Sequence, residues 1–151
     1  MRATEQARIL IIDDDETIRK SIASVLKNKG YLVDSAESGQ AAIGKSETEI
    51  YDLALIDIRL PDMDGVQLLT AMKETTPEMV KIIITGYPSL QNAMEAVNRG
   101  ADGYIVKPVK MDELLKTVEE HLKKQREARK YTEQKVADFI ETRAKELEGR
   151  K

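Results

Sequence analysis

The amino-acid sequence predicts an α/β protein with a doubly wound, five-stranded parallel sheet and a C-terminal helical extension. Five short apolar runs, which are typical of buried parallel strands, are spread along the first two thirds of the chain. Segments with apolar residues at helical spacing alternate with these runs, and glycine, proline or aspartate marks many of the junctions. Such an alternation favours parallel strands joined by crossover helices that cover both faces of the sheet.

The predicted strands are apolar runs that are too short to be helices. The first, Ile9–Ile12, contains only isoleucine and leucine and ends in three aspartates, Asp13–Asp15. The third, Asp52–Asp57, ends in a carboxylate shortly before Pro61, where a turn is expected. The complete set of predicted strands covers residues 9–12, 31–33, 52–57, 79–84 and 104–106.

Each predicted strand is followed by a segment with the periodicity of an amphipathic helix. The first helix has Ile18, Ile22 and Leu26 on one face and Gly30 at its expected end. The second begins at a serine cap, residue 38, and is the weakest because Gly44 interrupts it. The other predicted helices run from residue 64 to about 72, from 88 to the glycine at 100, and from 111 to 122.

The distribution of charge divides the chain near residue 122. Residues 1–120 hold 14 basic and 21 acidic side chains, whereas residues 121–151 hold 10 and 6. We therefore predict one compact domain at residues 1–122 and a charged helical linker or tail at residues 123–151.

The tail has a weak apolar pattern. Gln125, Arg129 and Thr132 occupy positions where the seam of a coiled coil needs leucine or isoleucine, and Val136, Phe139 and Ile140 form one apolar patch. A solvated helical linker is the first interpretation, and a weak dimerisation helix is the alternative. The tail contains no helix-turn-helix, Walker or zinc motif. Two interpretations follow: a single-domain regulator with a helical tail, or the front piece of a longer chain with an output domain, which the charged end of the helix favours.

The composition excludes several classes of protein. The chain has no cysteine, which excludes disulfides and thiolate metal sites and favours a reducing compartment. A net charge of −3 does not indicate a nucleic-acid surface. No apolar run approaches the roughly 20 residues that cross a bilayer, and the N-terminus lacks the apolar core of a signal peptide. We expect a cytoplasmic protein, and we expect that residues 1–151 bind neither a membrane nor nucleic acid.

Functional side chains occur at the ends of four predicted strands. These are Asp13 and Asp14, Asp57, Thr85 and Lys107. Because the carboxyl ends of parallel strands lie at one edge of the sheet, we expect these side chains to converge there. Three carboxylates in one crevice repel one another, and a Mg²⁺ ion would remove that conflict. A carboxylate nucleophile, a metal, a cation and a hydroxyl donor together make a phosphoryl-transfer site.

Four motifs at these strand ends carry a resemblance to a known family. They are IIDDD at residues 11–15, LIDIRLPDMDG at 55–65, IIITG at 82–86 and GADGYIVKP at 100–108. From Ala7 to Leu122 the chain resembles a receiver domain of two-component response regulators, which implies the flavodoxin-like (βα)5 fold. The ITGYP wording at residues 84–88 also resembles receivers that precede ATPase modules of the nitrogen-regulator type.

The resemblance implies a role for each acidic residue. Asp57 would be the phosphoacceptor, which takes a phosphoryl group from the phosphohistidine of a partner sensor kinase. Asp14 and Asp57 would bind Mg²⁺ together with the main-chain carbonyl of Arg59, and Asp13 would orient metal-bound water. The protein would then be a signalling switch and not an enzyme that acts on external substrates.

The resemblance also implies how the switch works. Thr85 would move to hydrogen-bond the phosphoryl group, Lys107 would pair with another of its oxygens, and Tyr104 would turn inward as Thr85 moves. The Lys107–Pro108 bond would be cis. The output surface would be formed by the fourth helix, the fifth strand and the fifth helix, and Arg59 and Tyr87 would tune dephosphorylation. Dimerisation through this surface, helped by the tail, is a further expectation.

Three alternative functions are also compatible with the sequence. The first is a Mg²⁺-dependent phosphatase with an aspartate nucleophile, although Ile58-Arg59 supplies no second acid two residues after Asp57. The second is a flavin binder, although Asp13–Asp15 would repel the flavin phosphate. The third is a pseudo-receiver that acts only by binding protein. His121, the one histidine, is interpreted as a solvated surface residue.

Overall fold

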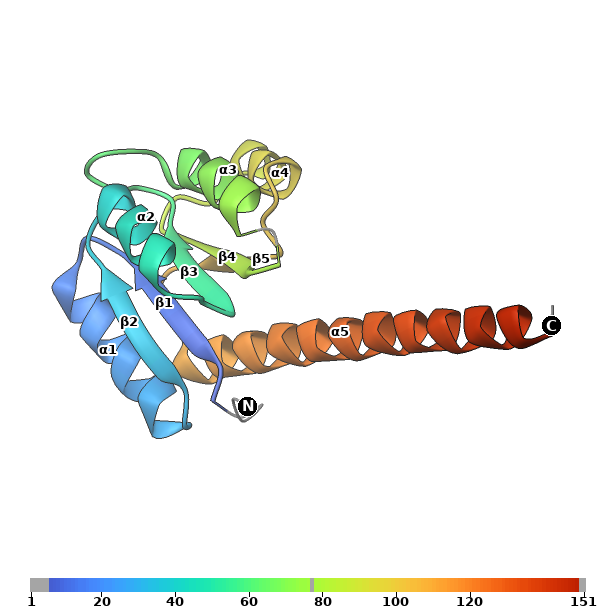
Figure 1. Cartoon of the computed structure of the whole chain (residues 1–151). Helices are drawn as coiled ribbons and strands as arrows, with labels where there is room; N and C mark the ends of the chain where they lie inside the picture. The colour runs from blue at the N-terminus through green and yellow to red at the C-terminus, as the bar shows by residue number, and fades with distance from the viewer. Residues whose placement is uncertain (1–5, 77, 150–151) are drawn as a thin grey trace.

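The computed structural model describes residues 6–76 and 78–149. Strands and helices alternate strictly from the first strand to the last helix (Figure 1). The strands are β1 (Arg8–Ile12), β2 (Leu32–Ala36), β3 (Leu53–Asp57), β4 (Val80–Thr85) and β5 (Gly103–Val106). The helices are α1 (Glu16–Asn28), α2 (Gly39–Thr48), α3 (Gly65–Thr75), α4 (Leu90–Asn98) and α5 (Met111–Glu148).

The five strands form one parallel sheet in the order β2-β1-β3-β4-β5. This confirms the doubly wound sheet that the sequence predicts. The strand order reverses beside β1, which lies between β2 and β3. In sheets of this kind the ligand crevice lies at such a switch point, outside the carboxyl ends of the strands.

Two layers of helices cover the two faces of the sheet (Figure 1). On one face the buried side chains of α2, α3 and α4 pack against the sheet through Ala42, Leu69 and Ala96. On the other face α1 and α5 pack through residues such as Ile22 and Val118. The central strand β3 is buried along its whole length. Burial on both faces explains why its sequence is apolar throughout and not alternating.

Several boundaries differ from the sequence prediction by one or two residues, and the differences are larger at the ends of β2 and α3. The second strand was expected at residues 31–33 but extends over Leu32–Ala36. It lies at the edge of the sheet and includes the polar pair Asp34 and Ser35, both half-buried, so it lacks a continuous apolar run. Helix α3 continues to Thr75, three residues beyond the expected end.

Helix α5 is one continuous helix of 38 residues. Its first part is held against the sheet by Leu114, Val118 and Leu122, which are all buried. Its later part projects beyond the sheet (Figure 1), where Val136, Phe139 and Ile140 are exposed. Among the described residues, no helix combines the length and apolar character needed to cross a membrane.

The α5 helix also contacts the amino edge of the sheet, which lies opposite the predicted site. The Gln125 side-chain amide donates hydrogen bonds to the carbonyl oxygens of Asp52 and Glu78, at 3.0 and 2.9 Å.

The interpretation of His121 as a solvated residue is wrong. Its ring is half-buried, and its two nitrogens lie 2.9 and 3.0 Å from the carbonyl oxygens of Thr117 and Asp102.

Candidate functional site

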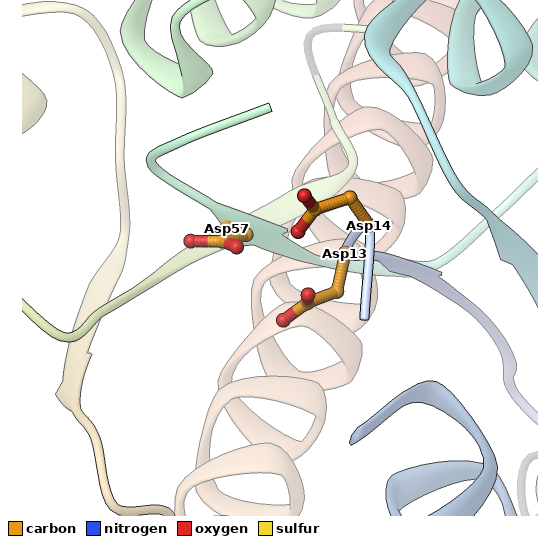
Figure 2. A group of neighbouring side chains, drawn as sticks. All are labelled: Asp13, Asp14 and Asp57. Carbon is orange, nitrogen blue, oxygen red and sulfur yellow. The ribbon is translucent and has the colours of Figure 1, made fainter. Parts of the chain in front are cut away.

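The structure brings the predicted site residues to the carboxyl edge of the sheet. Asp13 follows β1, Asp57 ends β3, Thr85 ends β4 and Lys107 follows β5. Asp14 is the next residue after Asp13 and belongs to the same turn (Figure 2). The parallel topology alone explains this convergence, because every strand ends at the same edge.

Three carboxylates form the acidic centre of this edge. Ligand oxygens of Asp13, Asp14 and Asp57 all lie within 4.8 Å of one another (Figure 2). Asp13 and Asp57 are buried, whereas Asp14 is exposed. Carboxylate oxygens are the donors that Mg²⁺ prefers, and one exposed ligand leaves room for the waters that this ion retains. The donor set therefore fits a hard divalent cation.

The Asp57 carboxylate is held in a partly compensated environment. Burial and the charge of Asp13 raise its pKa above the usual value for aspartate, while the Arg59 backbone N–H and Lys107 oppose this increase. The Arg59 N–H lies 3.3 Å from Asp57 Oδ1. A proton and a metal ion compete for such a carboxylate, so a cation at this position would favour the ionised, nucleophilic form.

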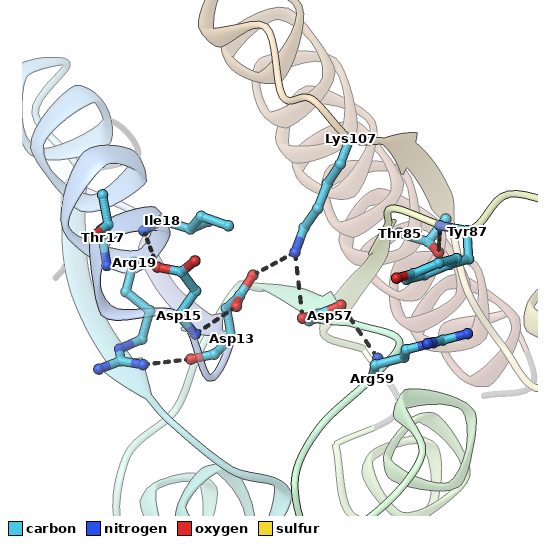
Figure 3. Close-up of polar contacts among 10 residues, drawn as sticks. All are labelled: Asp13, Asp15, Thr17, Ile18, Arg19, Asp57, Arg59, Thr85, Tyr87 and Lys107. Atoms are coloured by element: carbon cyan, nitrogen blue, oxygen red, sulfur yellow. Dashed lines mark hydrogen bonds and ion pairs between the residues drawn. The ribbon is translucent and has the colours of Figure 1, made fainter.

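Lys107 bridges the two buried carboxylates. Its Nζ lies 3.1 Å from Asp13 Oδ2 and 3.4 Å from Asp57 Oδ2 (Figure 3). Burial disfavours the ammonium form, but the hydrogen bond to Asp13 and the charges of Asp57 and Asp13 outweigh it and raise the Lys107 pKa. The lysine therefore remains a cation at the edge of the site. The Lys107–Pro108 peptide bond is cis, as the resemblance implied.

The turn after β1 contains two contacts that sequence reasoning missed. Arg19 Nη1 donates a hydrogen bond of 2.7 Å to the Asp13 carbonyl oxygen, and the Asp15 backbone N–H donates to Asp13 Oδ1 at 2.9 Å (Figure 3). Asp15 also caps α1 by accepting hydrogen bonds from the backbone of Thr17 and Ile18. The triple aspartate signalled acidity, and only the tertiary structure distinguishes the capping residue from the two that enter the cluster.

Thr85 is fully buried, and its hydroxyl is turned toward the following loop. Its Oγ1 accepts a hydrogen bond of 3.0 Å from the Tyr87 backbone N–H (Figure 3). The Thr85 carbonyl oxygen accepts a second bond from the Lys107 N–H at 2.7 Å, which joins β4 to the segment after β5. The Tyr104 hydroxyl is buried and has no hydrogen-bond partner among the described residues.

Two exposed side chains meet beside Asp57. The Arg59 guanidinium carbon lies 3.7 Å from the centroid of the Tyr87 ring, a cation–π contact (Figure 3). The family resemblance implied that both residues tune dephosphorylation, but nothing in the sequence predicted that their side chains are in contact. The contact joins the loop that follows Asp57 to the loop that follows Thr85.

The loop between β3 and α3 approaches the phosphoacceptor candidate closely. A Cβ at Gly65 would lie 2.5 Å from the Asp57 carbonyl oxygen and 2.8 Å from Ile58 Cα, so only glycine fits there. The Asp64 side chain accepts from the backbone of Val66, and Gln67 completes a capping box at the start of α3. These contacts return the chain tightly from the strand into the helix.

The fold and this acidic edge define an α/β domain of the receiver type. Residues 9–119 match the model of the response regulator receiver domain, so the chain belongs to this family.

Curated relatives include the transcriptional regulatory protein ZraR of Klebsiella oxytoca, which is 37% identical over 118 residues. The match covers 78% of this chain and 27% of ZraR. The transcriptional regulatory protein GlrR of Escherichia coli K12 is 32% identical over 138 residues, covering 91% of this chain and 30% of GlrR. The chain therefore spans less than a third of the length of these relatives.

Two solved structures illustrate the likeness in fold. A CheY-like response regulator receiver domain protein from Methanospirillum hungatei JF-1 superimposes with a TM-score of 0.80 at 43% identity, covering 82% of this chain and 98% of that one. NtrX from Brucella abortus also gives 0.80, at 30% identity, covering 85% of this chain and 29% of NtrX. Together they show the same receiver fold.

Proposed function

We propose that this protein is a phosphorylation-activated signalling switch with Asp57 as the phosphoacceptor. The observation that carries the proposal is the convergence of Asp57 with two further carboxylates and with the Lys107 ammonium group. Membership of the receiver family supports it, since receivers take part in two-component signalling. The phosphodonor in this proposal is a sensor histidine kinase.

In the proposed reaction a carboxylate oxygen of Asp57 attacks the phosphorus atom of a phosphohistidine. A new P–O bond forms, the P–N bond of the donor breaks, and the departing imidazole takes up a proton. The product on this chain is an acyl phosphate at Asp57. Phosphoryl transfer of this kind depends mainly on positioning and on charge stabilisation, and both are what the crowded edge supplies.

The groups that would hold Mg²⁺ are Asp14, Asp57 and the main-chain carbonyl of Arg59, with Asp13 orienting a water ligand. When bound, the ion would neutralise charge on the carboxylates and on the phosphoryl oxygens. Lys107, already 3.4 Å from Asp57, would pair with a phosphoryl oxygen. Thr85 would exchange its contact with the Tyr87 backbone for a hydrogen bond to the phosphoryl group.

The output surface in this proposal consists of α4, β5 and the start of α5. Apolar side chains are exposed on the first two of these elements: Leu90, Met94, Val97 and Val106. Movement of Thr85 would act on this surface through Tyr104, which is the second residue of β5. A new dianion at Asp57 then shifts the balance between two arrangements of the surface.

We also propose a division of labour along the chain. Residues 1–122 would form the receiver, and residues 123–151 a helical connection to an output domain. Two relatives in which this segment forms less than a third of the chain are transcriptional regulators, which supports an output of that general kind. A homodimer through the output surface, helped by the exposed apolar patch of the tail, completes the proposal.

The direct test is phosphorylation by a small donor. The protein is incubated with acetyl phosphate and Mg²⁺ and weighed intact, beside an Asp57→Asn variant and a sample with chelator. We expect one added phosphoryl group, absent from both controls. Beryllofluoride, which mimics the acyl phosphate without turnover, is added where hydrolysis hides the product. If neither phosphate nor beryllofluoride binds, the domain is a pseudo-receiver that acts only by protein binding.

A further inference from the structure

The carboxylate of Asp62, in the loop between β3 and α3, receives two backbone hydrogen bonds from another element. Its Oδ1 accepts from the Gly39 N–H at 2.9 Å and its Oδ2 from the Gln40 N–H at 2.8 Å. These are the first two residues of α2, and 22 or 23 positions separate them from Asp62. Both oxygens of one exposed carboxylate are therefore used at a single helix end.

The first turn of α2 needs these bonds. The leading N–H groups of a helix have no partner within the helix. Ser38 caps only one of them, the N–H of Ala41, at 3.1 Å. Asp62 accepts from two more, those of Gly39 and Gln40, and its negative charge lies at the positive end of the helix dipole. The hydrogen bonds from Gln40 and Gly39 lower the pKa of Asp62, because they favour its ionised form.

An apolar contact accompanies the two hydrogen bonds. Met63, the next residue of the loop, lies directly over Gly39, where an added Cβ would overlap its side chain. Met63 and Leu60 are half-buried and pack against the core cluster on this face of the sheet. The tip of the loop thus rests on α2 through a polar contact on its outer side and an apolar contact on its inner side.

The base of the same loop carries the residue next to the acidic cluster. Ile58 and Gly65 close the base through an N–H···O bond of 2.8 Å, and Arg59 pairs with Asp64 as an isolated antiparallel bridge. The direction of the Arg59 carbonyl depends on how this short segment is held. The hydrogen bonds of Asp62 with Gly39 and Gln40 connect this loop to a separate helix, α2.

We propose that Asp62 is a positioning residue for the Mg²⁺ site, holding the β3–α3 loop against the start of α2 so that Arg59 presents its main-chain carbonyl beside Asp57. This inference rests on the proposed function, because it assigns a purpose to Asp62 only where the acidic edge binds a metal. Residues that orient metal ligands without touching the metal commonly change metal affinity by about 10–100-fold when they are replaced.

The test follows Mg²⁺ binding by amide resonances of the full chain, without any phosphorylation. In Asp62→Ala we expect faster hydrogen exchange at Gly39 and Gln40 and a Mg²⁺ dissociation constant that rises about tenfold. Asp62→Asn retains one carbonyl oxygen as acceptor, so an intermediate increase is expected, and this milder variant serves where the alanine variant does not fold. Unfolding in the presence of chelator measures any purely structural loss separately.

Glu37→Gln is the matched control. Glu37 is exposed, lies one residue before the Ser38 cap, and carries the same charge near the same helix end. Its replacement should leave the Mg²⁺ dissociation constant unchanged. A folded Asp62→Ala variant with wild-type Mg²⁺ affinity would overturn the role of Asp62 and leave the proposed function intact. A wild-type chain that binds no Mg²⁺ would instead overturn the proposed metal site, and the role of Asp62 with it.

Discussion

The Lys107 ammonium nitrogen lies 3.4 Å from a carboxylate oxygen of Asp57, although 50 positions separate the two residues in the chain. The same nitrogen lies 3.1 Å from Asp13. Because Asp13 and Asp57 are buried, the lysine offsets repulsion that water cannot screen there. Lys107 is therefore a cation that offsets the charge of these two carboxylates.

Replacing Lys107 by methionine should destabilise the metal-free protein by about 2 kcal/mol, since two buried carboxylates lose their common partner. Mg²⁺ should restore part of this loss, because a divalent cation can take over the compensation. Denaturant unfolding with chelator and with Mg²⁺ measures both effects. Lys110→Met is the control: its pair with Glu113, at 3.9 Å, is exposed and should contribute at most about 1 kcal/mol. Equal losses in the two variants would contradict this account of the site.

The stacked pair Arg59 and Tyr87 should slow loss of the phosphoryl group. It ties the loop after Asp57 to the loop after Thr85, and its removal should let water reach the acyl phosphate more easily. Exposed cation–π contacts contribute about 0.5–1 kcal/mol, which corresponds to roughly two- to fivefold faster hydrolysis in Arg59→Ala or Tyr87→Ala. The rate is read from intact mass against time after the donor is removed.

Tyr87→Phe keeps the aromatic face and should retain the wild-type rate of hydrolysis. The double variant, Arg59→Ala with Tyr87→Ala, should be no faster than either single variant, because both changes remove one contact. Additive effects would show that the two side chains act independently.

Tyr104→Phe should stabilise the unphosphorylated protein by about 1 kcal/mol. The Tyr104 hydroxyl is buried without a partner among the described residues, and an unsatisfied buried hydroxyl costs about 1–3 kcal/mol. Phenylalanine removes the oxygen and keeps the packing of the ring. Thermal or denaturant unfolding of the two proteins provides the comparison, and a less stable phenylalanine variant would show that the hydroxyl is hydrogen-bonded in solution.

The sequence was sufficient to predict the sheet, the helices and the convergence of Asp13, Asp14, Asp57, Thr85 and Lys107. Buried strands have apolar runs whatever their neighbours are, and parallel topology then places all strand ends at one edge. The contacts of Arg19, Asp62 and His121 could not be predicted in this way. Each joins a side chain to a backbone group whose position depends on the completed fold. The identity of one polar residue does not specify which backbone group it will contact.

The same limit applies to Gln125. In the sequence it is a poor coiled-coil residue, but in the structure it fills a specific place, where it bridges the starts of β3 and β4 through the Asp52 and Glu78 carbonyls. Gln125→Ala should therefore destabilise the protein by about 1–2 kcal/mol, since two hydrogen bonds are lost. Hydrogen exchange should also become faster in α5 around residues 121–129, because this part of the helix loses its attachment.

Glu127→Ala is the matched control for Gln125→Ala. Glu127 is exposed, two positions further along the same helix, and its replacement should leave both the unfolding free energy and the exchange of α5 near wild type. If the two variants behave alike, the amide of Gln125 does not fasten α5 to the sheet.

Tyr51 should make the stability of the protein depend on pH in the alkaline range. Its hydroxyl donates a hydrogen bond of 2.7 Å to Asp34, and burial together with this bond raises its pKa well above the usual value. A group with a raised folded-state pKa contributes its full stability below the unfolded-state pKa, about 10 for tyrosine, and loses it as the pH rises through the folded-state value. Tyr51→Phe should thus be less stable than wild type at neutral pH by about 1–2 kcal/mol. The difference should narrow above pH of about 10, as measured by urea unfolding across the alkaline range, and a constant difference would contradict the assignment.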